Sequence, residues 1–266
     1  MKTPREIVRS RQNALAKRLA ALRRPGAGEP DVMLLEGPRL IAEALASGVT
    51  LDLAAVAESV LEDARPLLER LEDAGVALHV LSDPLLAALS ELETSQGLLA
   101  LGQRPRFEAA AAFGGTPLVL VAVAIQNPGN LGGLLRTAEA AGATGAWLTE
   151  GCADPYSWKS LRGSMGSAFR LPIERQITER DVVTRLRARG LQVLATAAEA
   201  QTRYDAVDWR LPTALLVGSE GAGLPASLER AADARIGIPI APPVESLNVG
   251  VAAGILLFEA ARQRRR

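Results

Sequence analysis

The stretch IPIAPPVESLNVGVAAGILLF, residues 238–258, joins an apolar strand to an apolar helix through a loop that contains three prolines. A loop stiffened in this way can shape a pocket. Ser246 is the expected N-cap of the helix, because its hydroxyl can accept a hydrogen bond from a backbone N–H of the first turn, where Asn248 then lies. From Val249 to Phe258 the helix is apolar or small on every side, which predicts complete burial. Two glycines one turn apart each cost about 1 kcal/mol relative to alanine, so we expect another backbone or a ligand to approach the helix closely.

The composition is typical of a globular protein with one or two domains. The chain has 266 residues, 48% of them hydrophobic, and lacks an apolar run near the roughly 18 residues that cross a membrane. We expect no secretory signal, and the single Cys152 excludes a disulfide framework, so a cytoplasmic protein without membrane contact is predicted. Because His79 is the one histidine, the sequence offers no zinc-type ligand cluster and no Ser-His or Cys-His pair. We therefore expect neither a metal nor triad chemistry.

Charge is segregated along the chain although its formal net value is zero. Residues 1–24 hold eight Lys or Arg against Glu6 alone, residues 29–75 hold eleven Asp or Glu against three Arg, and the chain ends in the Arg-rich segment 262–266. Basic ends can contact phosphate backbones, or they can simply be solvated. If they contact RNA, we expect the acidic region to face away from it.

The apolar pattern predicts an α/β protein with two domains, residues 1–106 and 117–266. In the first domain a basic helix over residues 5–24 precedes alternating strands and helices. The predicted strands are Val32–Leu35, Leu51–Ala57, Val76–Leu81 and Leu98–Gly102, and the predicted helices are 38–47, 60–74 and 84–91. Turn-forming residues between Arg104 and Pro117 read as a linker.

The second domain begins with Leu118–Ile125, a continuous apolar run typical of a strand buried on both faces of a parallel sheet. Further strands are predicted at Ala146–Thr149, Leu191–Ala197, Ala214–Gly218 and Ile236–Ile240. Helices are predicted near 131–141, 156–167, 179–189 and 225–231.

A first polar motif, NPGNLGGLLR at residues 127–136, follows the strand Leu118–Ile125 directly. Asn130 is a natural N-cap, and the glycines of the motif allow a ligand or another backbone to come close. Gly132 and Arg136 share a helix face, which leaves room in front of the guanidinium for an anionic substrate group. The alternative is a capped helix whose arginine is only surface charge.

A second motif, LLVGSEGAGL at residues 215–224, is a strand that enters a glycine-rich turn with Glu220 at its crest. Gly218 and Gly221 permit the tight turn, and the carboxylate can orient an arginine or a substrate hydroxyl. The alternative is a turn without function. Together with the opening stretch, these motifs give three strand-to-loop junctions in one domain, the arrangement that lines a ligand crevice at strand carboxyl ends.

The three motifs resemble those of the SpoU (TrmH-like) family of RNA ribose 2′-O-methyltransferases, in the SPOUT superfamily. The likeness covers roughly residues 117–260, in the correct order. Its parts are Asn127-Pro-x-Asn-x-Gly-x-x-x-Arg136, Leu216-Val-x-Gly-x-Glu-x-x-Gly223, and Ile238-Pro with Ser246-Leu-Asn-Val-x-Val251. The first hundred residues resemble the family's L30-like substrate-binding domain, notably at Leu35-Glu-Gly-x-Arg39 and Thr94-x-x-Gly-Leu98. Pro242 departs from the glycine usual in the family, which removes one backbone donor near the cofactor.

The resemblance implies a C-terminal domain with a deep trefoil knot that binds S-adenosylmethionine, and a homodimer that completes each site. Backbone groups around Gly218, Ile238 and Leu247 would hold this cofactor, with Thr196 at the adenosine side. The polar part of the site would consist of Asn130, Arg136, Glu220, Ser246 and Asn248. A guanidinium stays protonated in proteins, so Arg136 is better suited to stabilise a developing 2′-alkoxide than to act as a base. Glu220 or a substrate phosphate would take the proton.

The resemblance therefore predicts an RNA 2′-O-methyltransferase that acts on ribosomal RNA. Transfer RNA is the alternative substrate of the same class. A non-catalytic RNA-binding or ribosome-assembly protein that retains the cofactor pocket is a second alternative, and the joint presence of Arg136, Glu220 and Asn248 argues against it. A small-molecule nucleotide enzyme would leave the first domain and the basic ends unexplained. Outside the motifs, Trp147, Trp158 and Trp209 are expected to be packing residues, and Lys159 and Arg162 are weaker candidates for phosphate contact.

Overall fold

The structure is a computed structural model that describes residues 6–23 and 29–265, and the chain divides into two compact units. The N-terminal unit contains Met1–Pro105 together with Tyr156–Leu161, and the C-terminal unit contains Arg106–Pro155 and Arg162–Arg266. Tyr156–Leu161 thus lies with the first unit, although the sequence predicts it as part of the second domain. As a consequence, the chain passes between the two units three times.

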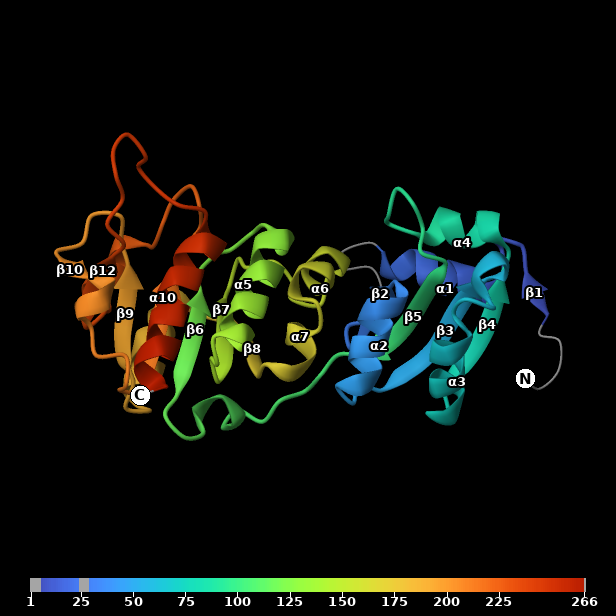
Figure 1. Cartoon of the computed structure of the whole chain (residues 1–266), viewed down its shortest axis with the longest axis horizontal. Helices are drawn as coiled ribbons and strands as arrows, with labels where there is room; N and C mark the ends of the chain where they lie inside the picture. The colour runs from blue at the N-terminus through green and yellow to red at the C-terminus, as the bar shows by residue number, and fades with distance from the viewer. Residues whose placement is uncertain (1–5, 24–28, 266) are drawn as a thin grey trace. The chain divides into compact units, whose positions relative to one another are not determined.

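A five-stranded mixed sheet in the order β1-β4-β3-β5-β2 forms the centre of the N-terminal unit (Figure 1). The parallel strands are β1 (Ile7–Val8), β4 (Ala77–Leu81) and β3 (Leu51–Ala57), and β5 (Leu98–Gln103) runs antiparallel to β3 and to β2 (Val32–Glu36). The helices are α1 (Ala14–Leu22), α2 (Pro38–Ala46), α3 (Arg65–Asp73) and α4 (Asp83–Leu89). Buried side chains such as Leu19, Leu53 and Leu99 form the core of the unit. The four strands predicted here are confirmed to within one residue at each end.

Two helix predictions in this unit were wrong in their extent. Residues 6–23 do not form one helix, because Ile7–Val8 pairs with β4 and α1 begins only at Ala14. The cause is Asn13, whose side chain accepts the Leu15 N–H at 2.9 Å and caps the helix there. The helix predicted over 60–74 begins at Arg65, where a proline occupies the first turn.

The C-terminal unit is built on a seven-stranded sheet in the order β10-β12-β9-β11-β6-β7-β8, and every pair in it is parallel. The central strands are β9 (Gln192–Thr196), β11 (Thr213–Val217), β6 (Leu118–Ala122) and β7 (Gly145–Thr149). Shorter or peripheral strands are β10 (Thr202–Arg203), β12 (Ala234–Gly237) and β8 (Ile173–Ile177). The helices are α5 (Pro128–Ala140), α6 (Trp158–Ser164), α7 (Ser167–Arg170), α8 (Glu179–Arg187), α9 (Ala226–Ala231) and α10 (Val249–Arg264).

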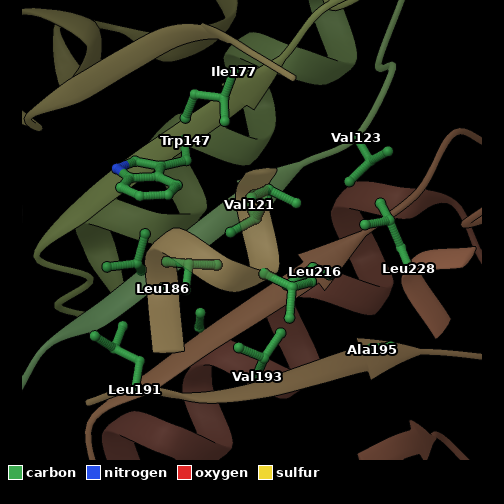
Figure 2. Close-up of a cluster of buried hydrophobic side chains, with 14 of the residues drawn as sticks. Val121, Val123, Trp147, Ile177, Leu186, Leu191, Val193, Ala195, Leu216 and Leu228 are labelled. Atoms are coloured by element: carbon green, nitrogen blue, oxygen red, sulfur yellow. The ribbon is translucent and has the colours of Figure 1, made fainter. Parts of the chain in front are cut away.

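Both faces of this sheet are buried. Figure 2 shows one face, where Trp147, Val193 and Leu216 of the strands pack with Leu186 of α8 and Leu228 of α9. Residues that alternate with these along the strands, such as Leu120 and Leu215, are also fully buried. A parallel sheet covered on both sides explains why its strands are continuous apolar runs. The predicted α/β class is therefore confirmed, and the trefoil knot stays a prediction of the resemblance.

The strand β8 and the division of the helix predicted over 156–167 were not anticipated. β8 has the sequence Ile-Glu-Arg-Gln-Ile and lies at the edge of the sheet, where Arg175 and Gln176 are exposed. The predicted helix is interrupted at Met165 and Gly166, which both adopt positive φ values, and it continues as α7.

Candidate functional site

Two of the three predicted strand-to-loop junctions, those after β11 and β12, meet the end of β9 at one pocket of the C-terminal unit, whereas the predicted junction after β6 does not line it. Because β12, β9 and β11 are neighbouring parallel strands, their carboxyl ends lie at the same edge of the sheet. The pocket at this edge is lined by the predicted residues Thr196, Gly218, Glu220, Ile238, Ser246 and Leu247. It is also lined by Ala197, Ala198, Ile240 and Ala252, which the sequence did not suggest because small apolar side chains carry no chemical signal.

The loop after β11 can turn tightly because position 218 has no side chain. A Cβ on Gly218 would lie 2.2 Å from the carbonyl carbon and oxygen of Gly223, closer than any real contact. The turn is closed by the Gly223 N–H, which donates to the Ser219 carbonyl at 2.9 Å, and Gly223 itself has φ +66°. A Cβ on Gly221 would meet nothing within 4 Å, so the turn requires Gly218 and Gly223 rather than the predicted pair of Gly218 and Gly221.

Asn248, not Ser246, is the N-cap of α10. The Asn248 Oδ1 accepts from the Gly250 N–H at 2.9 Å and from the Val251 N–H at 3.3 Å. Its Nδ2 donates to the Glu220 Oε1, so the same amide caps the helix and holds the carboxylate at the crest of the neighbouring loop. The Ser246 hydroxyl has no hydrogen-bond partner among the described residues and lies exposed at the pocket. The sequence prediction was wrong because it placed the start of the helix two residues too early.

In the loop between β12 and α10, few backbone N–H and C=O groups bond to one another. Within residues 238–247 of the described structure, a single hydrogen bond joins two backbone groups, from the Val244 N–H to the Ala241 carbonyl at 3.3 Å. The remaining N–H and C=O groups along this wall can therefore bind a ligand. Apolar side chains such as Ile238 and Leu256 beside free backbone donors and acceptors suit a flat, partly polar ligand such as adenosine.

The helix α5 carries the remaining two predicted site residues, Asn130 and Arg136. Its N-cap is Asn127, whose side chain accepts from the Gly129 N–H at 2.8 Å and the Asn130 N–H at 3.2 Å, so the prediction of Asn130 as the cap was wrong. The sequence predicts that the glycines of this motif allow either a ligand or another backbone to come close, and the structure shows a backbone there. A Cβ on Gly163 of α6 would lie 3.0 Å from the Gly129 carbonyl oxygen and 3.2 Å from the Gly132 Cα.

Arg136 is exposed, and its guanidinium makes no hydrogen bond or ion pair with any described residue. Neither Arg136 nor Asn130 lines the pocket. One chain thus brings Glu220 and Ser246 to the pocket, with Asn248 bonded to Glu220. It leaves the Arg136 guanidinium without a partner among the described residues on the adjacent helix α5, which packs against α10. A free guanidinium is available for a phosphate or an oxyanion that a bound partner supplies.

The apolar sequence of α10 predicts complete burial, and this prediction was wrong. Val251 is 53% exposed and Phe258 is 48% exposed, and Val244 in the preceding loop is 54% exposed. The buried face carries Ala253, Leu256 and Leu257. A Cβ on Gly254 would lie 3.5 Å from the Thr137 Cγ2 of α5, which is an ordinary van der Waals distance. A Cβ on Gly250 would contact only the side chain of Asn248. The close backbone approach expected at these two glycines is not found in the described part of the chain.

The Arg-rich end of the chain is used by the fold. The Arg264 guanidinium donates to the carbonyls of Thr116, Pro117, Trp209 and Leu211 at 2.7–3.0 Å. Partial burial lowers the pKa of Arg264. Pro117 and Leu211 precede β6 and β11, so Arg264 lies at the amino edge of the sheet, away from the pocket. The sequence left phosphate contact and solvation open for the basic end of the chain, and at Arg264 the structure shows a third role, in which the fold binds the guanidinium.

The basic N-terminal segment is partly neutralised by the acidic region that follows it. Arg18 pairs with Glu29 at 2.7 Å and lies 3.7 Å from Asp52, and Arg23 pairs with Glu91. Glu29 and Asp52 of the acidic region therefore lie beside the basic segment, and the expectation that this region faces away from RNA stays a prediction. Other basic residues of α1 and its preceding turn remain exposed and without a partner among the described residues, namely Arg11 and Lys17.

Cysteine and tryptophan serve mainly the fold. Trp147 and Trp209 are at most 1% exposed. The Cys152 thiol lies 3.3 Å from both the Ile125 N–H nitrogen and the Ala122 carbonyl oxygen, and burial raises its pKa. Trp158 differs, because it is partly exposed and its indole N–H donates to Glu36 at 2.8 Å. Across residues 6–23 and 29–265, no group of three or more His, Cys, Asp or Glu is arranged to hold a metal, and no helix is long and apolar enough to span a membrane.

Comparison with known proteins agrees with this geometry. The profile of the SpoU rRNA Methylase family matches residues 117–258, and that of the thiostrepton-resistance methylase N terminus matches residues 5–114. The chain is 36% identical to an uncharacterized tRNA/rRNA methyltransferase of Synechocystis sp., over 97% of this chain and 94% of the relative. It is also 36% identical to the 23S rRNA (guanosine(2553)-2'-O)-methyltransferase RlmP of Bacillus subtilis, over 86% of this chain and 88% of the relative.

A solved structure extends the likeness to three dimensions. The AdoMet-bound rRNA methyltransferase from Sinorhizobium meliloti has a TM-score of 0.84 to this chain at 30% identity, and the match covers 97% of both chains. Nearly the whole chain is therefore shared with this enzyme, including both units. The chain belongs to the SpoU rRNA methylase family.

Proposed function

We propose that the protein transfers a methyl group from S-adenosylmethionine to a ribose 2′-hydroxyl of ribosomal RNA. The observation that carries this proposal is the hydrogen bond by which Asn248 fixes Glu220 at the mouth of the pocket. A protein that only bound RNA would not require a carboxylate held in one position beside a ligand site. The Bacillus relative that acts on 23S rRNA and the AdoMet-bound Sinorhizobium structure support the substrate and the cofactor.

The pocket suits S-adenosylmethionine, which supplies a methyl group on a positively charged sulfur. The free backbone groups around Gly218, Ile238 and Leu247 would bind the adenosine and methionine parts, and Thr196 would lie at the adenosine side. The apolar side chains of this wall would exclude water from them. Pro242 removes one N–H from the loop, so the donors come from its other residues.

The polar residues would align the ribose and manage its proton. Arg136 would stabilise the 2′-oxygen as negative charge develops on it, because a guanidinium donates hydrogen bonds and keeps its charge. The Glu220 carboxylate, oriented by Asn248, or a substrate phosphate would accept the proton from the 2′-hydroxyl. Ser246 and Asn130 would add hydrogen bonds to the ribose or to its phosphates.

A homodimer would complete each site. The exposed apolar residues Val251 and Phe258 lie one above the other on α10, seven residues apart, and form a stripe suited to a partner surface. Arg136 does not line the pocket of its own chain, so a second copy of the chain is the natural source of this residue. The reacting groups would then come from both protomers.

The N-terminal domain, residues 1–106, would bind the RNA substrate. Arg11 and Lys17 are free to contact phosphates, whereas Arg18 and Arg23 are held in ion pairs. A ribosomal RNA substrate fits the cytoplasmic location that the sequence predicts. Transfer RNA is the alternative substrate.

The proposed function predicts that Arg136→Ala abolishes methyl transfer while cofactor affinity stays unchanged. The expected loss is about 10²–10⁴-fold in kcat, the scale for one positioned proton-handling or oxyanion-stabilising group. Transfer of labelled methyl groups from S-adenosylmethionine to 23S rRNA and tRNA transcripts measures activity and separates the two substrates. Calorimetric titration with S-adenosylmethionine measures the affinity.

Arg230→Ala is the matched control, because Arg230 is an exposed arginine on α9 of the same unit and has no hydrogen-bond or ion-pair partner in the part of the chain that the structure describes. We expect it to retain wild-type turnover. Near-normal turnover of Arg136→Ala at saturating RNA would refute the role of Arg136. Loss of 2′-O-methylation at one ribosomal position in a strain that lacks the protein, restored by the gene, would identify the target nucleotide.

A further inference from the structure

The helix α5 carries one acidic residue, Glu139, which follows Arg136 by one turn. Side chains three positions apart lie on the same face of a helix, so the Glu139 carboxylate is the natural partner of the Arg136 guanidinium within this helix. Another pair at the same spacing, Glu259 and Arg262 of α10, does form an ion pair, with the charges in the opposite order. In the described part of the chain, Arg136 and Glu139 do not pair, and the reason lies in a second arginine.

The Glu139 carboxylate is bound by Arg170, the last residue of α7. The Arg170 Nε donates to the Glu139 Oε1 at 2.6 Å, and the Arg170 Nη2 donates to the Glu139 Oε2 at 2.9 Å. Such bidentate pairs are among the stronger hydrogen-bonded contacts of a carboxylate. The hydrogen bonds from Arg170, together with one from the Ser167 side chain, hold the pKa of Glu139 below its usual range. Both carboxylate oxygens of Glu139 are therefore already engaged.

The break in the chain at residues 165–166 places Arg170 beside α5. Both residues of the break have positive φ values, and the chain then forms the short helix α7. Phe169 of α7 is 3% exposed, so the core holds this turn in place. Because α7 packs against α5 within the C-terminal unit, its last side chain lies within reach of Glu139. The interruption that the sequence did not predict thus fixes the position of this arginine.

From these contacts we infer that Arg170 is a positioning residue for methyl transfer, which occupies the Glu139 carboxylate and thereby keeps the Arg136 guanidinium free for the RNA. The inference rests on the proposed function, because a free Arg136 affects turnover only if it acts on the RNA ribose. Without Arg170, the Glu139 carboxylate would turn to Arg136 on the same helix face. Its negative charge would also repel the substrate phosphates and the charge that develops on the 2′-oxygen.

Three variants separate this role from a structural one. Arg170→Met keeps the aliphatic length and releases Glu139. We expect its kcat for methylation of a 23S rRNA transcript to fall about 2–10-fold, because a carboxylate on the same helix face offsets only part of the charge of Arg136. Glu139→Gln removes the competing charge and keeps an acceptor for Arg170, so it should retain wild-type kcat. The double variant, Arg170→Met with Glu139→Gln, should also recover wild-type kcat, since position 139 then carries no charge.

Recovery in the double variant is the result that a structural role cannot give. If the ion pair only held α7 against α5, the double variant would be no more active than Arg170→Met, and that result overturns the inference. Wild-type kcat in Arg170→Met overturns it as well.

Arg210→Met is the matched control, because Arg210 makes the same kind of bidentate contact in the same unit. Its Nε and Nη2 donate to the two carboxylate oxygens of Asp208 at 2.7 and 2.9 Å. Asp208 precedes β11 and does not lie on α5, so the control should keep wild-type kcat. A loss in Arg210→Met equal to that in Arg170→Met would reveal an effect of net charge and would overturn the inference.

A carboxyl titration makes the outcome independent of the reaction. Nuclear magnetic resonance of protein labelled at the glutamate carboxyl carbons measures the pKa of Glu139, whose signal is assigned by its loss in Glu139→Gln. In the wild-type chain Arg170 binds the carboxylate, so Arg136→Ala should leave this pKa unchanged. In the Arg170→Met background we expect Arg136→Ala to raise the pKa of Glu139, because the carboxylate then loses its new cationic partner.

The two measurements distinguish failure of the inference from failure of the proposed function. If the wild-type protein methylates neither 23S rRNA nor tRNA transcripts while the pKa of Glu139 responds to Arg136 in this way, the proposed function fails and the exchange of ion-pair partners stands. If the wild-type protein methylates RNA and the pKa of Glu139 does not respond to Arg136 in the Arg170→Met background, the inference fails and the proposed function stands.

Discussion

Asn248 performs two tasks with one side chain. Its oxygen caps α10, and its amide nitrogen holds Glu220, so the orientation of the amide is fixed from both ends. A serine at this position would cap the helix equally well. Its single hydroxyl would not extend to both partners, whereas the amide accepts from the helix with its oxygen and donates to Glu220 with its nitrogen. The structure thus explains why an amide, and not merely a capping residue, stands at the start of α10.

Replacing Asn248 by Asp and by Ala separates the two tasks. Asp caps helices as well as Asn does, but its carboxylate repels Glu220 where the amide had donated a hydrogen bond. We expect Asn248→Asp to keep the wild-type melting temperature and to lose about 10²-fold in kcat. Asn248→Ala should lose activity and, in addition, about 1 kcal/mol of unfolding free energy. Thermal unfolding and methylation assays measure the two effects.

Wild-type turnover in Asn248→Asp, with loss only in Asn248→Ala, would contradict the positioning role. Asn248 would then act through the helix cap alone. Glu220→Gln gives a second view of the same contact, since a glutamine oxygen can still accept from the Asn248 amide. If Glu220 accepts the proton, that variant should fold normally and remain impaired in turnover.

At the residue scale, the sequence predicts which residues gather but not their hydrogen bonds. Ser246, Asn248 and Asn130 are all good capping types, so propensity alone cannot select among them. The choice depends on which residue the turn places before the first helical amide, and this is a property of the whole loop. The burial of Glu36 could not be predicted from the sequence either, because a glutamate after an apolar strand is usually solvated and only tertiary contacts reveal that this one is buried.

At the scale of elements, continuous apolar runs identified the central strands because both sides of the sheet are covered. The same criterion failed for β8, an edge strand with polar residues, and for α10. The exposed stripe of α10 consists of residues as apolar as its buried face, so composition predicts burial without showing what covers each face. An apolar surface for a second protein chain has the same sequence signature as a core.

The end of α10 provides a stability test. Arg264 satisfies four carbonyls at the amino edge of the sheet, whereas Arg262, two residues earlier, forms an ion pair with Glu259 on the same helix and is 52% exposed. Arg264→Met keeps the aliphatic length and removes every donor. We expect a loss of roughly 2–4 kcal/mol in unfolding free energy from the unsatisfied carbonyls, measured by urea denaturation.

Arg262→Met is the control for this prediction, because exposed ion pairs contribute about 0–1 kcal/mol. Equal losses in the two variants would show that the carbonyl contacts of Arg264 add nothing beyond helix propensity. The comparison also tests the function of the basic end of the chain. If Arg264 serves the fold, RNA affinity measured well below the melting temperature should not change in Arg264→Met.

At the scale of the whole molecule, the sequence predicts two domains. One feature of the two compact units has no signal in the sequence. The segment Tyr156–Leu161 lies with the N-terminal unit because Trp158 and Tyr156 find partners there. Both partners, Glu36 and Arg104, are more than fifty residues away in sequence. Local periodicity carries no information about such pairs, so the place of this segment in the N-terminal unit emerges only from the three-dimensional structure.

The last prediction concerns the homodimer. Phe258→Glu places a charge in the exposed stripe of α10, where a partner chain would bury it without a counter-ion. We expect this variant to sediment as a monomer at micromolar concentration and to lose methyl transfer while keeping its fold. Leu211→Glu is the matched control, since Leu211 is 50% exposed, close to the 48% of Phe258, but lies before β11 at the amino edge of the sheet. It should remain dimeric and active.

A mixing experiment then shows whether Arg136 acts on the partner's pocket. Arg136→Ala and Asn248→Asp are each expected to be nearly inactive. If Arg136 and Asn248 of one reaction site come from different chains, a mixed dimer contains one fully intact site and one site with both changes. Random exchange of equal amounts makes half of the dimers mixed, so about a quarter of the wild-type activity returns. If both residues of a site belong to the same chain, every site carries a change and no activity returns, which would contradict the shared site even if the protein is a dimer.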